Sequence, residues 1–446
     1  MDRTEQRILD VIERNREKIL AFGRDIHAHA EMGYKETRTA QKFAQALTEL
    51  GLPVQQGLAI TGVKGTLKAE GGEDIQVALL GEYDALMIPD NATANPETGA
   101  AHCCGHDAQL TGVMGAAIAL CDPEVRRELD GDVCFFGVPS EEYGEIEFKD
   151  SLVREGKIRY GGGKSELIRI GAFDDIDLCI AHHSGPVPLI VGNGTNSGFV
   201  SKVIRYTGKA SHAAGAPDKG INALNAASLG LQAMSCIREQ YRDDEHVRVH
   251  AIITKGGDLI NVTPDNVVLE GMVRAMTMEA VQQTERKVDR AFRGGAVSMG
   301  AGVAISTRPG YLPQVPSTDN SVLLHAASVA APEIETLEFA PDSHNGGSTD
   351  VGDVQHLMPV LVFRTGGYSG NTHAVNFAVE DEELYYILTA KMFALGTYRL
   401  LKSRAAEARR TVGNYRPRLT KAQYIDYMES MIRDEVLEEV QDGCKK

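Results

Sequence analysis

The sequence predicts an α/β protein in which a domain built on a mostly parallel sheet is interrupted by a smaller α+β domain. Three observations predict this fold. Apolar runs of strand length alternate with helical patterns up to about residue 196. Between 197 and 308 the order becomes strand, helix, strand, strand, helix, strand, and the alternation resumes after Pro309. We therefore predict segments at 1–196, 197–308 and 309–446, of which the first and third form one unit.

Helical periodicity and stop signals define the elements of the first segment. Apolar residues from Ile8 to Phe22 recur at helical spacing, and a second helix over 37–50 ends at Gly51 and Pro53. Strands are expected over 61–69, 75–80, 133–138 and 178–181, and an alanine-rich helix over 110–120. Because strands and helices alternate, we expect a mostly parallel sheet with helices on both faces.

The middle segment has the element order of a split β-α-β sandwich of the ferredoxin-like type. Its expected strands cover 200–206, 247–254, 267–275 and 302–307, and its expected helices cover 222–239 and 278–293. In the last segment we expect a strand over 360–364 and a helix over 383–403. A charged tail from Ala405 is expected to be helical.

Composition excludes several classes of protein. Of the 446 residues, 43% are hydrophobic and 24% charged, which is typical of folded globular chains. A formal net charge of -16 argues against sequence-independent binding of nucleic acid, which needs a basic surface. No stretch approaches the roughly 18 apolar residues of a membrane span, and no signal peptide is evident. Seven scattered cysteines, an odd number, indicate a reducing, cytoplasmic location rather than a disulfide framework.

Two motifs near predicted strand ends have the composition of a metal site. H-C-C-G-H-D at 102–107 places two His and two Cys within a short segment before a helix. P-S-E-E at 139–142 places two adjacent carboxylates after a buried strand, where a cation would relieve their repulsion. The alternatives are a turn with incidentally buried thiols and a solvated acidic loop.

Three histidines occupy comparable positions. His182 and His183 end a predicted strand, and His373 follows a further strand in G-N-T-H-A-V at 370–375. Open α/β sheets bind their ligands at the carboxyl ends of their strands. The coincidence of these motifs at one sheet edge therefore predicts a metal site there.

Taken in order, the motifs resemble one family. They are G-E-Y-D-A-L, H-x-C-G-H-D, P-x-E-E, a strand-end His, G-x-x-S-H-A-A, G-S-T-D-V-G-D-V and T-H, and they span residues 23–380. The series is similar to the dinuclear-metal aminoacylase and carboxypeptidase family of amidohydrolases. The branch with Cys-Gly-His in place of an aspartate ligand fits best, in particular its aminobenzoyl-glutamate hydrolase-like and dipeptidase-like group.

The resemblance implies a set of metal ligands. They are Cys104, His106, Glu142, His183 and His373. The Cys104 thiolate would bridge two ions, and His182 remains the alternative to His183. The implied cofactor is one or two divalent ions per subunit, manganese or zinc, with cobalt as an alternative.

The resemblance also implies the remaining roles. Glu141 would be the general base, and Asp84 would orient a ligand. His212, in S-H-A-A, would polarise the substrate carbonyl and would come from the partner subunit of a homodimer, with delivery within one subunit as the alternative. Asn261 and Arg274 would bind the carbonyl and the carboxylate of a small-molecule substrate. On residue type alone, His212 is equally consistent with a surface histidine and Arg274 with a strand arginine on a solvated face.

The implied function is hydrolysis, by metal-held hydroxide, of an amide between an acyl or aryl-carbonyl group and an amino acid. The smaller domain would close over the site as a lid, on hinges near 197 and 308, and would also form the dimer. A deaminase using the same metal site and a catalytically silent binding protein are the rival hypotheses. Two motifs depart from the family pattern, H-H-S at 182–184 and T-H-A-V at 372–375. The stretch 144–150 is longer than usual and is a candidate specificity loop.

Overall fold

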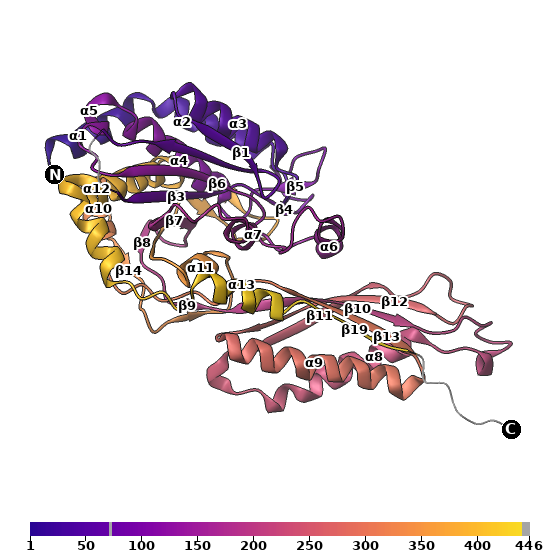
Figure 1. Ribbon diagram of the computed structural model, residues 1–446. Helices are drawn as coiled ribbons and strands as arrows, with labels where there is room; N and C mark the ends of the chain where they lie inside the picture. The colour runs from indigo at the N-terminus through magenta and orange to yellow at the C-terminus, as the bar shows by residue number, and fades with distance from the viewer. Residues whose placement is uncertain (71–73, 439–446) are drawn as a thin grey trace.

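Two large sheets organise the part of the chain that this computed structural model describes, residues 1–70 and 74–438 (Figure 1). They lie in separate regions of the molecule, and the chain passes between them after β9 (Thr195–Asn196) and again after β13 (Gly302–Pro309). The end of the predicted tail, which includes Cys444, lies outside the described residues.

The larger sheet has a parallel centre and antiparallel flanks. Its strand order is β1-β2-β6-β3-β7-β16-β8-β14. Within it, β6, β3, β7 and β16 run parallel, whereas β1, β2 and β8 pair with antiparallel neighbours. The strands are β1 (Val54–Leu58), β2 (Gly62–Leu67), β3 (Gln76–Glu82), β6 (Asp132–Val138), β7 (Leu178–Ser184), β8 (Leu189–Val191), β14 (Leu337–Glu338) and β16 (Val360–Thr365). The prediction of an α/β fold with a mostly parallel sheet is confirmed.

Helices cover both faces of this sheet (Figure 1). Successive side chains of β3 show the division, since Val77 and Leu79 pack into one core and Ala78 and Leu80 into another. The first core includes residues of α1 (Arg3–Arg14), α2 (Arg16–Ala28), α3 (Thr37–Glu49), α4 (His106–Leu120), α5 (Pro123–Arg126), α10 (Ser321–Ala330) and α12 (Leu388–Asn414). The second includes residues of α6 (Ile146–Arg154), α7 (Gly163–Arg169), α11 (Val351–Gln355) and α13 (Lys421–Ser430), of which α6 contributes Leu152.

The smaller sheet is antiparallel, with the order β11-β12-β10-β13-β19. Its strands are β10 (Gly198–Thr207), β11 (Arg248–Lys255), β12 (Asn266–Ala275), β13 and β19 (Arg433–Leu437), and its helices are α8 (Ala223–Cys236) and α9 (Met278–Met299). Both helices lie on one face, where they pack with the strands into a separate core. The opposite face of β10 is turned toward α6, where Val203 packs with Ile146. Without β19, the element order is that of a split β-α-β sandwich.

The charged tail is helical, as expected, to the end of α12 and again in α13, but its described part does not end as a helix. After α13 it continues into β19, which pairs with β13 and so joins the smaller sheet. The physical reason is an ionic one: Arg433 contacts the buried carboxylates of Glu285 and Asp289 on α9. The smaller unit, meaning the smaller sheet together with α8 and α9, therefore contains residues far outside 197–308.

The other elements are short. They are β4 (Leu86–Met87), β5 (Ala100–Ala101), β15 (His344–Asn345), β17 (Tyr368–Ser369), β18 (Ala378–Val379), 3-10 turns at 217–219, 237–240 and 243–245, and a π-helical turn at 383–387. The single N-terminal helix that we expected is two helices, divided at Asn15. No helix among the described residues is both long and apolar enough to cross a membrane.

Candidate metal centre and active site

The carboxyl ends of the parallel strands bring the candidate ligands together. Glu82 ends β3, Glu141 and Glu142 follow β6, and His183 lies near the end of β7. His106 begins α4, which packs against β3. This arrangement is the one that parallel sheets use to bind ligands.

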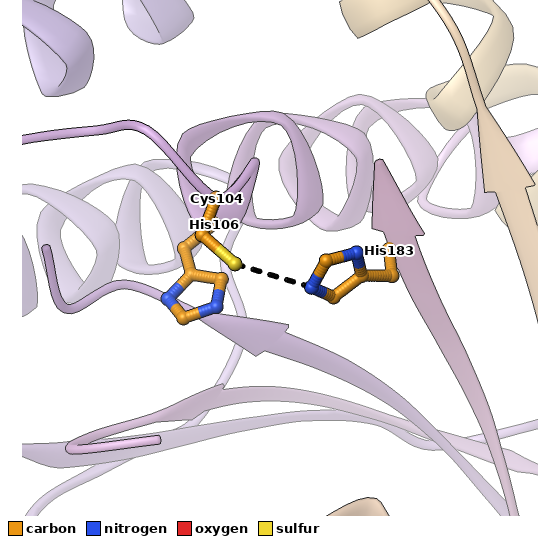
Figure 2. Close-up of side chains that lie close together, drawn as sticks. All are labelled: Cys104, His106 and His183. Atoms are coloured by element: carbon orange, nitrogen blue, oxygen red, sulfur yellow. Dashed lines mark hydrogen bonds between the residues drawn. The ribbon is translucent and has the colours of Figure 1, made fainter. Parts of the chain in front are cut away.

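Cys104 lies at the centre of the candidate ligands. Its Sγ atom is 3.2 Å from Nε2 of His183 and 3.2 Å from Nε2 of His373. Cys104 comes from the turn before α4 and His106 from the first residue of α4, and His183 faces them from β7 (Figure 2). The donor atoms of the five expected ligands form two groups, each within 4.8 Å: Cys104 with His106 and His183, and Cys104 with Glu142 and His373. A third such group joins His106 to Glu82 and Glu141. All five expected ligands thus belong to two groups that share one sulfur atom.

Local backbone geometry makes this approach possible. Gly105 has φ +102°, and a Cβ atom at this position would lie 2.7 Å from the side chain of Ser184. His373 also has a positive φ, 61°, and its backbone N–H donates to the carbonyl of Cys103 at 2.8 Å. The turn before α4 is therefore held directly against the segment that carries His373.

The pleat of β7 separates His182 from His183. His182 is buried beside the rings of Phe363 and Phe393, and its Nε2 lies 2.8 Å from Oγ1 of Thr365. Burial lowers the pKa of His182 well below its usual value. His183 is the member of the pair whose ring reaches Cys104. This placement favours His183 as the ligand.

Asp84 contacts two of the expected ligands. Its Oδ2 accepts a hydrogen bond from the backbone N–H of Glu142 at 2.7 Å, and its carbonyl oxygen lies 2.8 Å from Nδ1 of His106. A hydrogen bond at Nδ1 leaves Nε2 of His106 free to face the cluster. This geometry fits the orienting role expected for Asp84.

Electrostatics and donor chemistry of the site fit a divalent cation. Burial raises the pKa of the Cys104 thiol well above its usual value, and Glu142 adds to the effect. Burial opposes protonation of His106, but Glu82 and Asp84 outweigh it and raise its pKa. Within the described chain, His106 Nε2 and Glu142 Oε1 are buried without a hydrogen-bond partner. Sulfur, imidazole and carboxylate donors turned toward one space are typical of transition-metal sites.

A buried ionic cluster stands behind Glu141. Lys164 contacts Glu82 and Asp350, all three are fully or almost fully buried, and Oε2 of Glu82 lies 3.2 Å from Nε2 of His106. Burial raises the pKa of Glu141 well above its usual value, and the charge of Glu82 adds to the effect. We assigned no role to Glu82, Lys164 or Asp350 from the sequence. Each of the three residues lies in a short glycine-containing motif that could have drawn attention to it: G-E-Y-D at 81–84, G-G-G-K at 161–164 and G-S-T-D at 347–350.

A pocket of about 540 Å³ opens onto this centre from between the two sheets. Its walls include Arg274 on β12, Phe199 on β10 and Tyr311 after β13, together with Glu141 and His183. Tyr143 and Gly144 also line the pocket, and Gly144 is the first residue of the candidate specificity loop. Most of that stretch is not a loop, because residues 146–150 form the start of α6. The volume suits a small molecule.

Four expected site residues do not line this pocket. Asp84 and His106 are buried against its lining residues, whereas the other two lie elsewhere. His212 and Asn261 are both exposed on the smaller unit. They lie side by side, because Ala213 donates to the carbonyl of Asn261 at 3.0 Å and His212 forms a β-bridge with Val262. The described chain thus groups these two residues apart from the other members of the site.

Comparison with known proteins gives a consistent picture. Residues 78–394 match the family described as Peptidase family M20/M25/M40. An Xaa-Arg dipeptidase of Mus musculus is 30% identical over 357 residues, 76% of this chain and 71% of that protein. One of the subunits of the p-aminobenzoyl-glutamate hydrolase of Escherichia coli is 27% identical over 404 residues, 87% of this chain and 79% of that protein.

A solved structure supports the same fold. It is a dinuclear metal binding peptidase of the M20 family from Bacillus subtilis, superposed with a TM-score of 0.62 at 23% identity. The match covers 87% of this chain and 99% of that structure. The family resemblance noted in the motifs is therefore confirmed. This chain belongs to peptidase family M20/M25/M40 and is a metal-dependent hydrolase of amide bonds.

Proposed function

We propose that this protein releases an amino acid from an acyl or aryl-carbonyl group by hydrolysing the amide bond between them. The observation that carries the proposal is the pair of ligand groups that share Cys104, in a pocket that is lined by both Cys104 and Glu141. Relatives named for the release of arginine and of glutamate act on bonds of this kind.

Cys104, His106, Glu142, His183 and His373 would hold one or two divalent ions. Bound ions would supply positive charge that polarises the attacking water and the amide carbonyl. Manganese or zinc suits this mixture of sulfur, imidazole and carboxylate donors, and cobalt is the alternative. A reducing, cytoplasmic location also fits, because Cys104 can act as a ligand only as a free thiolate.

Glu141 is the proposed proton carrier. It is 6% exposed and lines the pocket. It lies in a group with Glu82 and His106 but in neither of the two groups that share Cys104. It would accept a proton from the attacking water and deliver it to the leaving nitrogen.

Arg274 is the proposed partner of the substrate carboxylate. Its guanidinium group lies over the ring of Phe199, 5.4 Å from the ring centre, and 3.4 Å from the hydroxyl of Ser348. No carboxylate among the described residues contacts it. A substrate carboxylate would supply the missing negative charge.

His212 and Asn261 would act on the active site of the partner subunit in a homodimer. Two features of the smaller unit support this arrangement. Strand β11 is an unpaired edge of the smaller sheet as described, and Ile252 and Ile253 on it are 59% and 40% exposed. An edge strand with exposed apolar side chains is suited to pairing with a second copy of itself. The smaller unit would then act as both lid and dimer interface.

A metal and product analysis tests the proposed function. Chelator-treated protein should be inactive, and added manganese, zinc or cobalt should restore activity. N-acyl amino acids, aryl-carbonyl glutamates and dipeptides should then be assayed for free amino acid and for ammonia in parallel. Amino-acid release supports the proposal. Release of ammonia without amino acid would instead indicate a deaminase, and binding without either product a silent homologue.

A further inference from the structure

Arg364 lines the active-site pocket, yet its charge is not matched by any carboxylate of the described chain. It lies on β16, in parallel register with His183 on β7, so its side chain starts on the same face of the sheet. Its Nε atom is buried without a hydrogen-bond partner, and the guanidinium group lies 5.1 Å from the centre of the Phe339 ring. Burial lowers the pKa of this group, but arginine remains charged at neutral pH.

Two partly buried arginines outside the pocket do have carboxylate partners. The side chain of Arg308 is 15% exposed, and its guanidinium group contacts the carboxylates of Asp150 and Asp434. Arg433 likewise contacts two carboxylates. A desolvated cation without a counter-charge is costly, so an unmatched arginine in a pocket indicates that the ligand provides the anion.

The charge distribution of the pocket points the same way. Its carboxylates, Glu82, Glu141 and Glu142, all lie in the metal centre. Among the described residues that line the rest of the pocket, the charged side chains other than histidine are Arg274 and Arg364. The other polar groups there are neutral hydroxyls and amides, so the pocket offers no acidic side chain to a cationic substrate group.

We propose that Arg364 binds a second carboxylate of the substrate, so that the protein acts preferentially on amides carrying two carboxylates. The inference rests on the proposed function, in which Arg274 binds the first carboxylate. The second can belong to the side chain of the released amino acid or to the acyl group. A substrate with a basic side chain would instead meet a second positive charge.

Matched substrate pairs test this specificity. N-acetylglutamate and N-acetylglutamine differ only in charge on the amino-acid side, and N-succinylalanine and its succinamyl analogue differ only in charge on the acyl side. The wild-type protein should prefer the dianion of at least one pair by about 10- to 100-fold in kcat/KM, the range expected for a charge-assisted hydrogen bond. The pair that shows the preference locates the second carboxylate.

The variant Arg364→Gln should abolish that preference. Arg242 lies on the smaller unit and its side chain is 71% exposed. Arg242→Gln is therefore the matched control and should keep the preference for the dianion. No preference in either pair would overturn the proposal. A preference that survives in Arg364→Gln would also overturn it. This includes the case in which the variant hydrolyses both members of a pair more slowly by the same factor, because an equal loss indicates that Arg364 only positions other groups.

An equilibrium measurement separates failure of this inference from failure of the proposed function. Glutarate and glutaramate share a shape and one carboxylate, and only glutarate carries the second. Metal-loaded wild-type protein should bind glutarate about tenfold or more tightly by calorimetry, and Arg364→Gln should bind the two alike. If no amide is hydrolysed, the proposed function fails, but this binding difference still supports the role of Arg364. Equal binding by the wild-type protein overturns it.

Discussion

The sulfur atom of Cys104 lies 3.2 Å from Nε2 of His373, although 269 positions separate the two residues in the chain. His183, 79 positions from Cys104, approaches the same sulfur at the same distance. Three segments that are remote in sequence thus converge on one thiol. This convergence is what a thiolate shared by two metal ions requires.

We predict that Cys104→Ser lowers the metal content by at least one ion per subunit. A serine hydroxyl stays protonated near neutral pH and is a poor ligand for zinc or manganese where a thiolate was bound. Elemental analysis of protein after gel filtration measures the loss.

Cys103→Ser is the matched control for this variant. The side chain of Cys103 is buried in the apolar core beneath the site, so its replacement can reduce stability but should leave the metal content unchanged. Equal metal loss in the two variants would show that the bridging ligand is misassigned.

We predict that Glu141→Gln keeps its metal and loses about 10²- to 10⁴-fold in turnover, because glutamine cannot accept a proton. Glu142→Gln should instead lose metal, since Glu142 lies with Cys104 and His373 in one ligand group. Metal analysis and kcat, measured on both variants, test the division of roles. A Glu141→Gln protein that loses an ion and recovers its rate in excess metal would reverse them.

We predict that His212 acts in trans. His212→Ala and Glu141→Gln proteins should each be inactive, but after subunit exchange a mixed dimer contains one complete site. Random exchange should restore roughly a quarter of wild-type activity. Native mass spectrometry must show the mixed dimer in the same sample. A mixed dimer without activity would exclude the trans arrangement.

We predict an acid-sensitive contribution to stability from His356. Burial lowers its pKa to about 4, whereas histidine in an unfolded chain titrates near ~6.5. The unfolded state therefore binds the proton first as the pH falls, so this contribution is complete above about pH 6.5 and is lost toward pH 4. We compare the drop in the free energy of unfolding between pH 7 and pH 5 in the two proteins. This drop should be roughly 1–2 kcal/mol smaller in His356→Gln than in the wild type.

Urea unfolding followed by circular dichroism measures this difference, because the chain contains no tryptophan. Glutamine keeps a donor for the Pro313 carbonyl, which lies 3.1 Å from Nε2 of His356. His29→Gln, which replaces a histidine at an exposed position, is the matched control for the substitution itself. An unchanged slope in His356→Gln would contradict the prediction.

Several elements follow from local sequence alone. The helix at 37–50 is observed as α3, and the strand expected over 133–138 is observed as β6 with one additional residue. Periodicity and stop signals report on such elements because they reflect interactions within a few residues. The same reasoning missed the break at Asn15 and strand β1, which depend on packing against other segments.

The candidate metal centre was predictable because its ligands lie in short motifs at strand ends. Sequence order could not separate His182 from His183. The pleat of β7 does so, since it directs one ring toward Phe363 and Phe393 and the other toward Cys104. A shift of one residue along a strand reverses the face that a side chain occupies.

By itself, then, the sequence determined the α/β architecture, the family and the segments that carry Cys104, His106 and Glu142. Only the tertiary structure decided which groups meet across long separations. It pairs Lys164 with Glu82 and Asp350, leaves Arg364 in the pocket without a carboxylate, and adds β19 to the smaller sheet. The physical reason is that hydrophobic periodicity is a local property. The counter-charge of a buried ion, or the partner of an edge strand, is fixed only when remote segments fold against each other.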